Sequence, residues 1–255
     1  MAKTYRATGI NLKGMPLGEK DKLLTVLTKE YGLVRVVAPG ARKYGSQLGG
    51  RSELFVVNDL LLTRGRTLDR IVQAEMQESF LRLGQNLGKL TCAQYLAEIV
   101  LKQALANQPQ VELFCVFTDL LQQLQKQERL TAILPVFVQG IYRLLALAGF
   151  APQLYRCAIS QEVVVPAAAP GRNVPFSVVA GGVVKPGVSA PISHYLTAQE
   201  LGALQALAAK ELPPEVLLLS RDAWLVLERV LRAYTQYHLE MHLQSAALIE
   251  RCFHL

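Results

Sequence analysis

Short runs of apolar, often β-branched residues, separated by turn signals, fill the first eighty residues of the chain. Gly14 and Pro16 end the first run, Gly32 separates the second from the third, and Pro39-Gly40 follows the third. The pattern predicts five strands over residues 5–12, 23–28, 33–38, 54–63 and 67–77. Two hairpins and a basic, glycine-bearing loop over 40–50 favour a small closed β-barrel of the OB type. An SH3-like barrel is the close alternative.

After Phe80 the apolar residues recur at helical spacing. This spacing predicts helices over residues 83–105, 112–126 and 130–147, the last ended by Gly149. Residues 130–150 are apolar enough to resemble a membrane span, but they include Pro135, Gln139 and Arg143. Because a charge near the middle of a span is costly, we expect a buried helix of a soluble bundle there, and no membrane partner.

Residues 151–192 are irregular, since they contain six prolines and four glycines. Valine-rich patches at 163–165 and 183–184 predict short strands within this insertion. Thr197 and Glu200 have capping-box spacing, and Ser220 is placed to cap a last helix over 221–243. The predicted fold class is α+β: a five-stranded OB-fold barrel in a domain over 1–80, then a mainly α-helical bundle domain over 81–255 that carries the insertion.

Positive charge is concentrated in the predicted barrel. Residues 1–80 contain thirteen Lys and Arg against eight Asp and Glu, which is +5 of the chain's net +7. Such a surface favours nucleic acid as partner first and an anionic membrane surface second, and a solvated basic face is the plainer alternative. The candidate phosphate-binding residues are Lys20, Lys22, Arg35, Arg42, Lys43, Arg51, Arg64, Arg66 and Arg70. Among nearby aromatics, Tyr44 is the best candidate to stack on bases, Tyr31 is another, and Phe55 is expected in the core.

Other chemistry has little support in the sequence. The chain has no G-x-S-x-G and no phosphate-binding Walker loop, so we expect no catalytic site, no cofactor and no small-molecule substrate. His238 and His242 have zinc-competent spacing, but an ordinary polar helix face is the expected structure. The cysteines at 92, 115, 157 and 252 form no C-x-x-C pair, which is typical of reduced thiols in the cytosol. Cys92 and Cys115 are expected in the core. The N-terminal segment lacks the apolar region of a signal peptide.

Ordered blocks along the chain resemble the bacterial DNA-repair family RecO. The first is Pro16-Leu17-Gly18-Glu19-Lys20-Asp21-Lys22-Leu23-Leu24. The later ones are residues 28–33 (TKEYGL), 37–42 (VAPGAR), 73–75 (QAE), 113–114 (LF), 148–152 (AGFAP) and 237–239 (YHL) with Ser245. The likeness covers nearly the whole chain.

This resemblance implies a recombination mediator without catalytic turnover, located in the cytoplasm at the nucleoid. Such a protein binds single- and double-stranded DNA, anneals complementary strands, and acts with RecR to load RecA onto strands coated by single-strand-binding protein. An alternative is an interaction adaptor whose helical grooves, lined by Leu113, Phe117 and Phe137, hold an acidic, aromatic-ended peptide, with DNA binding secondary.

Many members of this family also carry a small zinc-binding insertion with two C-x-x-C pairs, and here the sequence departs from them. Cys157 matches the first ligand, whereas Ser160, Lys185 and Val188 stand at the other three positions. Since structural zinc usually needs four ligands, we expect a degenerate, metal-free insertion. It should fold by packing Val163, Val165, Phe176, Val178 and Val183.

Overall fold

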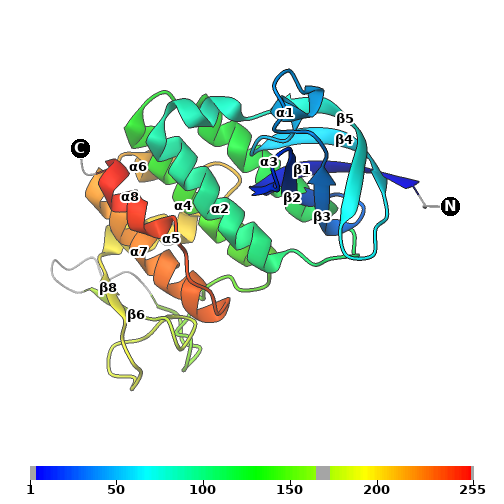
Figure 1. Ribbon diagram of the computed structural model, residues 1–255. Helices are drawn as coiled ribbons and strands as arrows, with labels where there is room; N and C mark the ends of the chain where they lie inside the picture. The colour runs from blue at the N-terminus through cyan, green and yellow to red at the C-terminus, as the bar shows by residue number, and fades with distance from the viewer. Residues whose placement is uncertain (1–3, 165–172, 254–255) are drawn as a thin grey trace. The chain divides into compact units, whose positions relative to one another are not determined.

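The computed structural model describes residues 4–164 and 173–253 and divides the chain into two compact units, Met1–Lys126 and Gln127–Leu255. The first unit contains a β-barrel, two long helices and two short ones, and the second contains the helices after Lys126 and a small sheet (Figure 1). None of the helices in the described ranges is both long and apolar enough to cross a membrane.

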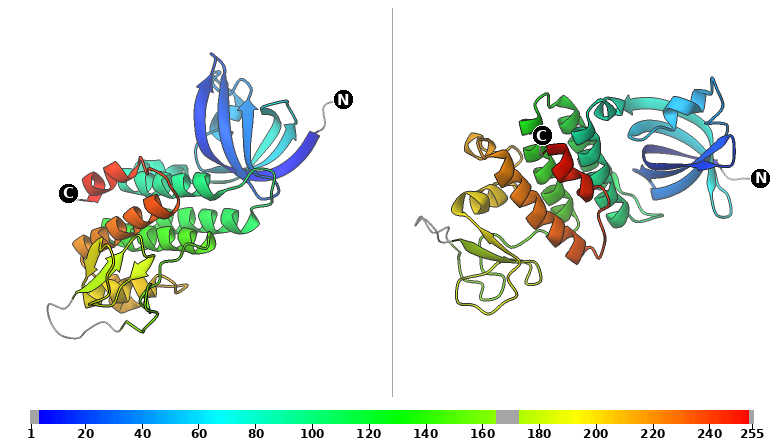
Figure 2. Two further views of the ribbon diagram at one scale, coloured as in Figure 1. Left: turned by 90° about the horizontal axis from the view of Figure 1, so that it is seen from below. Right: turned by 60° about the vertical axis from the view of Figure 1, so that its left-hand side comes forward.

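The barrel is closed, with strand order β1-β2-β3-β5-β4 (Figure 2). Neighbouring strands are antiparallel except β3 and β5, which pair in parallel through Val36–Asp69 and Val37–Arg70. This order is that of the OB-fold, which decides between the two barrel types that the sequence left open. The strands are β1 (Thr4–Leu17), β2 (Asp21–Thr28), β3 (Gly32–Ala38), β4 (Val56–Thr63) and β5 (Asp69–Ser79).

The predicted end of the first strand at Leu12 is wrong, because β1 continues through Gly14 and Pro16 to Leu17. Its pairing with β4 ends at Ile10, and after a bulge between Asn11 and Lys13 it pairs with β2 alone. A strand with one partner tolerates proline, whose missing N–H costs no ladder hydrogen bond on the open side.

The loop predicted over 40–50 contains a short helix, α1 (Gln47–Arg51). Two buried asparagines of the barrel hold it: Asn11 Nδ2 and Asn58 Nδ2 donate to the carbonyl oxygen of Arg51 over 2.8 and 2.9 Å. The helix depends on partners far away in sequence, so local residue patterns gave no signal for it.

The helices of the first unit follow β5. A 3₁₀ turn, η1 (Leu81–Gln85), leads into α2 (Leu87–Gln103), which Asn86 caps by accepting from the Lys89 N–H. The next helix, α3 (Val111–Lys126), begins one residue before its predicted start, ends where predicted, and packs against α2. Phe117 of α3 contacts Phe55, the residue just before β4, with ring centroids 6.2 Å apart, so this helix shares a core with the barrel.

In the second unit, α4 packs on α7. The predicted caps are confirmed: Thr197 and Glu200 form a capping box at α5, and Ser220 Oγ accepts from the Ala223 N–H at α7. The last long helix ends at His238 rather than near 243, since Glu240 takes a positive φ of 48°. The helices are α4 (Leu130–Leu147), α5 (Ala198–Ala206), α6 (Pro214–Leu217), α7 (Arg221–His238) and α8 (Ala246–Phe253).

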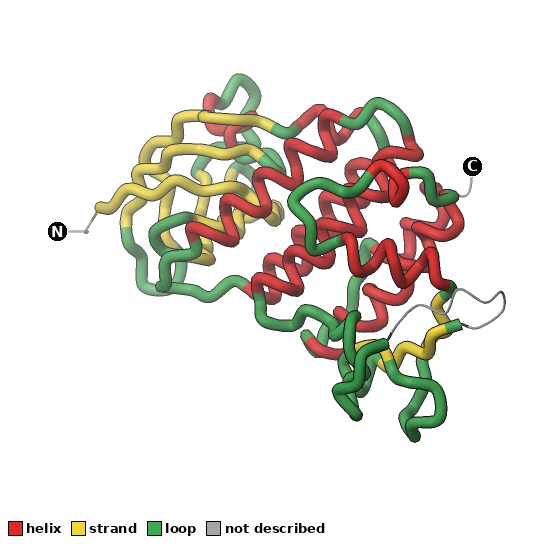
Figure 3. Tube along the Cα trace, turned by 180° about the vertical axis from the view of Figure 1, so that it is seen from behind, coloured by secondary structure: helices red, strands yellow, loops and turns green. Residues whose placement is uncertain are grey.

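The insertion forms a three-stranded sheet of order β7-β6-β8 beside long loops (Figure 3). Its strands are β6 (Val174–Ser177), β7 (Gly182–Val183) and β8 (His194–Leu196). Phe176, Val178 and Val183 are buried as predicted, whereas Val163 is 61% exposed and makes only a single bridge to Arg156. Val165 lies outside the described residues.

Candidate nucleic-acid interface

The β1–β2 turn and the loop after β3 lie together and carry several of the predicted cations. The Arg42 N–H donates to the Lys20 carbonyl over 2.9 Å, and Arg42 Nη1 donates to the Gly18 carbonyl over 2.8 Å. Asp21 Oδ1 accepts from the Gly40 N–H at 2.7 Å, which fixes the start of the loop. Lys20, Arg42 and Lys43 are therefore exposed cations on one connected pair of turns.

Lys22 and Arg51 lie beside this pair of turns but are partly buried. Lys22 Nζ is 2.6 Å from Glu53 Oε1, so part of its charge is already balanced. None of the other predicted phosphate contacts has a carboxylate within 4 Å in the described part of the chain. Unbalanced cations are the ones that attract phosphate most strongly.

The β4–β5 turn carries Arg64 and Arg66, and both are exposed. The Arg64 guanidinium lies 5.3 Å from the centre of the Tyr5 ring. Asp69 braces the turn, since its carboxylate accepts from the Gly65 N–H and from the Tyr5 hydroxyl. Burial, followed by this bond to Asp69, raises the pKa of Tyr5, so the phenol stays protonated as a donor.

Between these turns, the open outer face of the barrel presents two cross-strand rows. Lys13, Thr25 and Arg35 pair across β1, β2 and β3 in the first row. The second row contains Met15, Leu23, Val37 and Arg70, and Met15 is 50% exposed. The face thus combines three exposed cations, Lys13, Arg35 and Arg70, with an apolar ledge. The ledge consists of Met15, Leu23 and Val37. OB-folds bind oligonucleotides on this face, between the β1–β2 and β4–β5 loops.

Lys13 and Met15 were missed from the sequence because the first strand was expected to stop before them. Continuing its alternation past the bulge would have placed both on the outer face. Tyr44 is fully exposed, as a base-stacking residue requires, and Phe55 is buried as predicted. Tyr31 is half-buried and packs edge-on against Tyr5, with ring centroids 4.8 Å apart.

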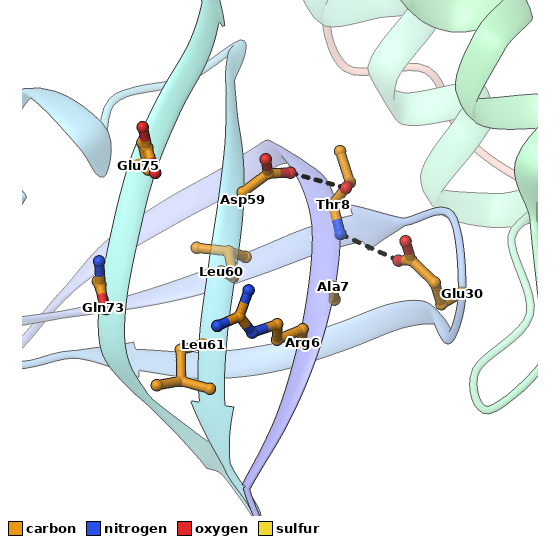
Figure 4. Close-up of a pocket in the computed structure, with 9 residues that line it drawn as sticks. All are labelled: Arg6, Ala7, Thr8, Glu30, Asp59, Leu60, Leu61, Gln73 and Glu75. Carbon is orange, nitrogen blue, oxygen red and sulfur yellow. Dashed lines mark hydrogen bonds between the residues drawn. The ribbon is translucent and has the colours of Figure 1, made fainter.

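A different side of the barrel is acidic. A cleft of about 300 Å³ opens over β1, β4 and β5 and contains Glu30, Asp59 and Glu75 (Figure 4). Thr8 organises it: its N–H donates to Glu30 Oε2 over 3.0 Å, and its hydroxyl donates to Asp59 Oδ1 over 2.8 Å. Among the described residues that line the cleft, Arg6 is the single cation. Three carboxylates repel phosphate, so this side does not suit a nucleic acid.

The residues proposed for a peptide groove do not line one. Leu113, Phe117 and Phe137 are at most 5% exposed, because each packs into the core. The second unit does contain a cleft of about 680 Å³ between α5, α6 and α7, where Leu218 is 85% exposed. Its described lining contains Glu215 but neither lysine nor arginine, so it does not suit an acidic peptide.

Two further predictions are corrected. Cys115 is exposed on α3, while Cys92 is buried as expected. His238 is the last residue of α7 and His242 lies beyond it, so the two do not share a helix face. Instead, His238 Nε2 bonds the Val178 carbonyl over 2.8 Å.

The residues of the insertion do not fit a structural zinc ion. Of the four positions that carry thiols in zinc-binding members, only Cys157 has a metal-ligating side chain. Among residues 4–164 and 173–253, no group of three or more His, Cys, Asp or Glu is placed to hold a metal.

Comparison with known proteins covers both parts of the chain. The family model "Recombination protein O N terminal" matches residues 1–80, and "Recombination protein O C terminal" matches residues 84–247. The DNA repair protein RecO of Trichodesmium erythraeum (strain IMS101) is 46% identical, over 98% of this chain and 95% of its own. Those of Gloeothece citriformis (strain PCC 7424) and Gloeobacter violaceus are 44% and 46% identical, each over 98% of this chain and over 98% and 94% of their own. The chain belongs to the RecO family of DNA repair and recombination proteins.

Proposed function

We propose that this protein is a recombination mediator that binds single- and double-stranded DNA through the barrel domain, residues 1–80, and anneals complementary strands. With RecR, it helps to load RecA onto strands coated by single-strand-binding protein, without catalytic turnover and without a cofactor. It works in the cytoplasm, at the nucleoid. Family membership supports the repair role, and the charge distribution of the barrel supports the binding mode.

The single observation that carries this proposal is the arrangement of unbalanced cations around the open barrel face. Three connections flank the face: the β1–β2 turn with Lys20, the loop after β3 with Arg42 and Lys43, and the β4–β5 turn with Arg64 and Arg66. Arg35 and Arg70 lie on the strands between them. Cations that contact phosphates release the counterions condensed on DNA, so binding gains free energy without any base being read.

Annealing requires that bases stay free to pair while backbones are held. Phosphate contacts along the face offset the repulsion between two strands, and only a few bases need to rest on Tyr44 or on the Met15 ledge. Exposed cations on all three flanking connections provide contacts for more than one strand.

The test is a salt titration of binding to matched single- and double-stranded oligonucleotides, between about 50 and 200 mM salt, using the full chain. The double variant R42E/K43E should bind at least about tenfold more weakly at the low-salt end. Its salt slope on single strands should fall by about 1.4, which corresponds to two lost contacts. A control, K210E/R251E, makes the same charge change at exposed positions of the second unit and should bind as the parent does.

Unchanged affinity of R42E/K43E would refute the assignment of these two contacts. Failure of the parent chain to bind either oligonucleotide in dilute buffer would refute the proposed function. Annealing is followed separately, by fluorescence quenching between complementary labelled strands. An R42E/K43E chain that anneals at the parent rate would show that annealing does not use this loop.

A further inference from the structure

Two turns of the insertion meet at one sulfur atom. Cys157 begins the first turn, in which the Gln161 N–H donates to the Cys157 carbonyl over 2.9 Å. Lys185 begins the second, in which the Val188 N–H donates to the Lys185 carbonyl over 3.1 Å. Cys157 Sγ accepts from the backbone N–H of Ser160 at 3.4 Å and from that of Lys185 at 3.3 Å. A single side chain therefore joins segments 28 residues apart.

The Cys157 side chain is closed to solvent, although Ser160 and Lys185 around it are exposed. Cys157 has no exposed surface, and its backbone is held on both sides: its N–H donates to the Glu162 carbonyl, and the next N–H, of Ala158, donates to the Val183 carbonyl. The ammonium of Lys185 pairs with the Glu162 carboxylate, which ties the same two turns at the surface. Hydrogen bonds from Ser160 and Lys185 outweigh the burial that would raise the pKa of the thiol and lower it to about 7.

In a zinc knuckle, one metal ion joins two such turns through four side chains. Here Ser160, Lys185 and Val188 supply no thiolate. Instead, the backbone N–H groups of Ser160 and Lys185 bond to Cys157 Sγ and join the two turns. We propose that the insertion is a metal-independent knuckle in which the Cys157 sulfur, as acceptor for both turns, takes the joining role of the metal ion. The proposal concerns the architecture of the insertion and does not depend on DNA binding.

The sheet of the insertion is ordered by packing and hydrogen bonds that involve no metal. Phe176 of β6 and Val183 of β7 are fully buried, and the Tyr234 ring of α7 lies 6.0 Å from the Phe176 ring, centroid to centroid. The bond from His238 to the Val178 carbonyl ties the β6–β7 turn to the same helix. Packing and hydrogen bonds thus supply the order that metal ligation supplies elsewhere.

The first test compares metal content and protease protection in the full chain. Elemental analysis should find less than about one zinc per ten chains, and EDTA should change the rate of cleavage within 151–192 by less than about twofold. The variant C157A removes the shared acceptor and should raise that cleavage rate about tenfold. C115A, at an exposed cysteine, is the matched control and should cleave at the parent rate. Stoichiometric zinc, protection lost with EDTA, or parent-like protection in C157A would each overturn the proposal.

A second variant tests whether the two turns converge on one point. If both turns converge as a knuckle, the triple variant S160C/K185C/V188C places four thiols around one point and should bind one Co²⁺, with thiolate-to-metal absorption that the parent chain lacks. Absence of these bands in the folded triple variant would show that the turns do not converge in this way. The same bands in the parent would show that it binds metal already.

Discussion

The Arg42 guanidinium donates a hydrogen bond of 2.8 Å to the Gly18 carbonyl, and this bond fixes a cation of the β3–α1 loop against the β1–β2 turn. Because a carbonyl does not neutralise the guanidinium, its charge stays available to a phosphate. The loop therefore presents Arg42 at a defined place, even though most of its own backbone is exposed.

We expect R42A to reduce the salt slope of single-strand binding by about 0.7, the loss of one phosphate contact. R42K keeps the positive charge but replaces the planar guanidinium by a single ammonium group, so it should keep the salt slope and lose affinity by about two- to fivefold. Fluorescence anisotropy over a salt series measures both. Equal slopes for R42A and the parent would mean that Arg42 does not contact phosphate.

Substitutions on the outer face of the barrel should distinguish residues that contact phosphates from residues that contact bases. K13A should lower affinity for single and double strands alike and reduce the salt slope by about 0.7–0.9. M15A should leave the slope unchanged and weaken single-strand binding alone, because only unpaired bases can lie on an apolar ledge. An oligonucleotide of abasic sites is the control, and it should bind M15A and the parent equally. A weaker complex of M15A with the abasic strand would contradict the stacking role.

Much of the barrel could be predicted because its turns are chosen by local chemistry. Gly32, with φ of 63°, sits in the tight turn between β2 and β3, where a Cβ would collide with the Leu105 carbonyl. The alternation on either side fixed both strands within one or two residues. The continuation of β1 through Gly14 and Pro16 could not be predicted in this way, since it depends on β2 pairing along one edge only.

The exposed cations of the candidate site could be predicted from the sequence, but the partners and positions of the neighbouring groups could not. Composition pointed to Arg42, Lys43, Arg64 and Arg66, because long cations near glycines are typically exposed. The partner of Lys22 and the position of α1 were not predictable, since Glu53, Asn11 and Asn58 reach them from other elements. The exposure of Cys115 was missed because its apolar neighbours Phe114 and Phe117 gave the helix a core-like composition.

The acidic cleft should act against DNA binding on its side of the barrel. Glu75 is exposed in the lining, and E75Q removes one of the three carboxylates with little change of shape. We expect E75Q to bind DNA with parent-like or up to about twofold higher affinity at low salt, because one repulsive charge is gone. K13Q, also an exposed strand position, is the opposite control and should weaken binding. A drop in affinity for E75Q would show that the Glu75 carboxylate supports DNA binding instead of opposing it, and a gain well above twofold would place DNA across the cleft.

The contact between Phe55 and Phe117 should hold the barrel and α3 as one cooperative unit. F117A removes a fully buried ring and should lower the free energy of unfolding of the first unit by about 3–5 kcal/mol. F117L keeps most of the volume and should cost about 1 kcal/mol. The only tryptophan, Trp224, reports on the second unit, so urea unfolding is followed by circular dichroism with Trp224 fluorescence in parallel. Little loss of stability in F117A would mean that α3 adds nothing to the barrel core.

The stability of the knuckle should depend on pH through Cys157. Its pKa is lowered from 9.0 to about 7, so the folded state favours the thiolate over the unfolded state. For an acid with a lowered pKa, the stabilisation is complete above about pH 9 and is lost as the pH falls through about 7. The charged groups near the sulfur are Lys185, Glu162 and Arg156, and the first two pair with each other.

The measurement is the ratio of cleavage rates of C157A and the parent within 151–192, because the ratio cancels the protease's own pH dependence. The ratio should rise from pH 6 to pH 9, and a ratio that is flat or falls over that range would show that the folded state does not favour the thiolate.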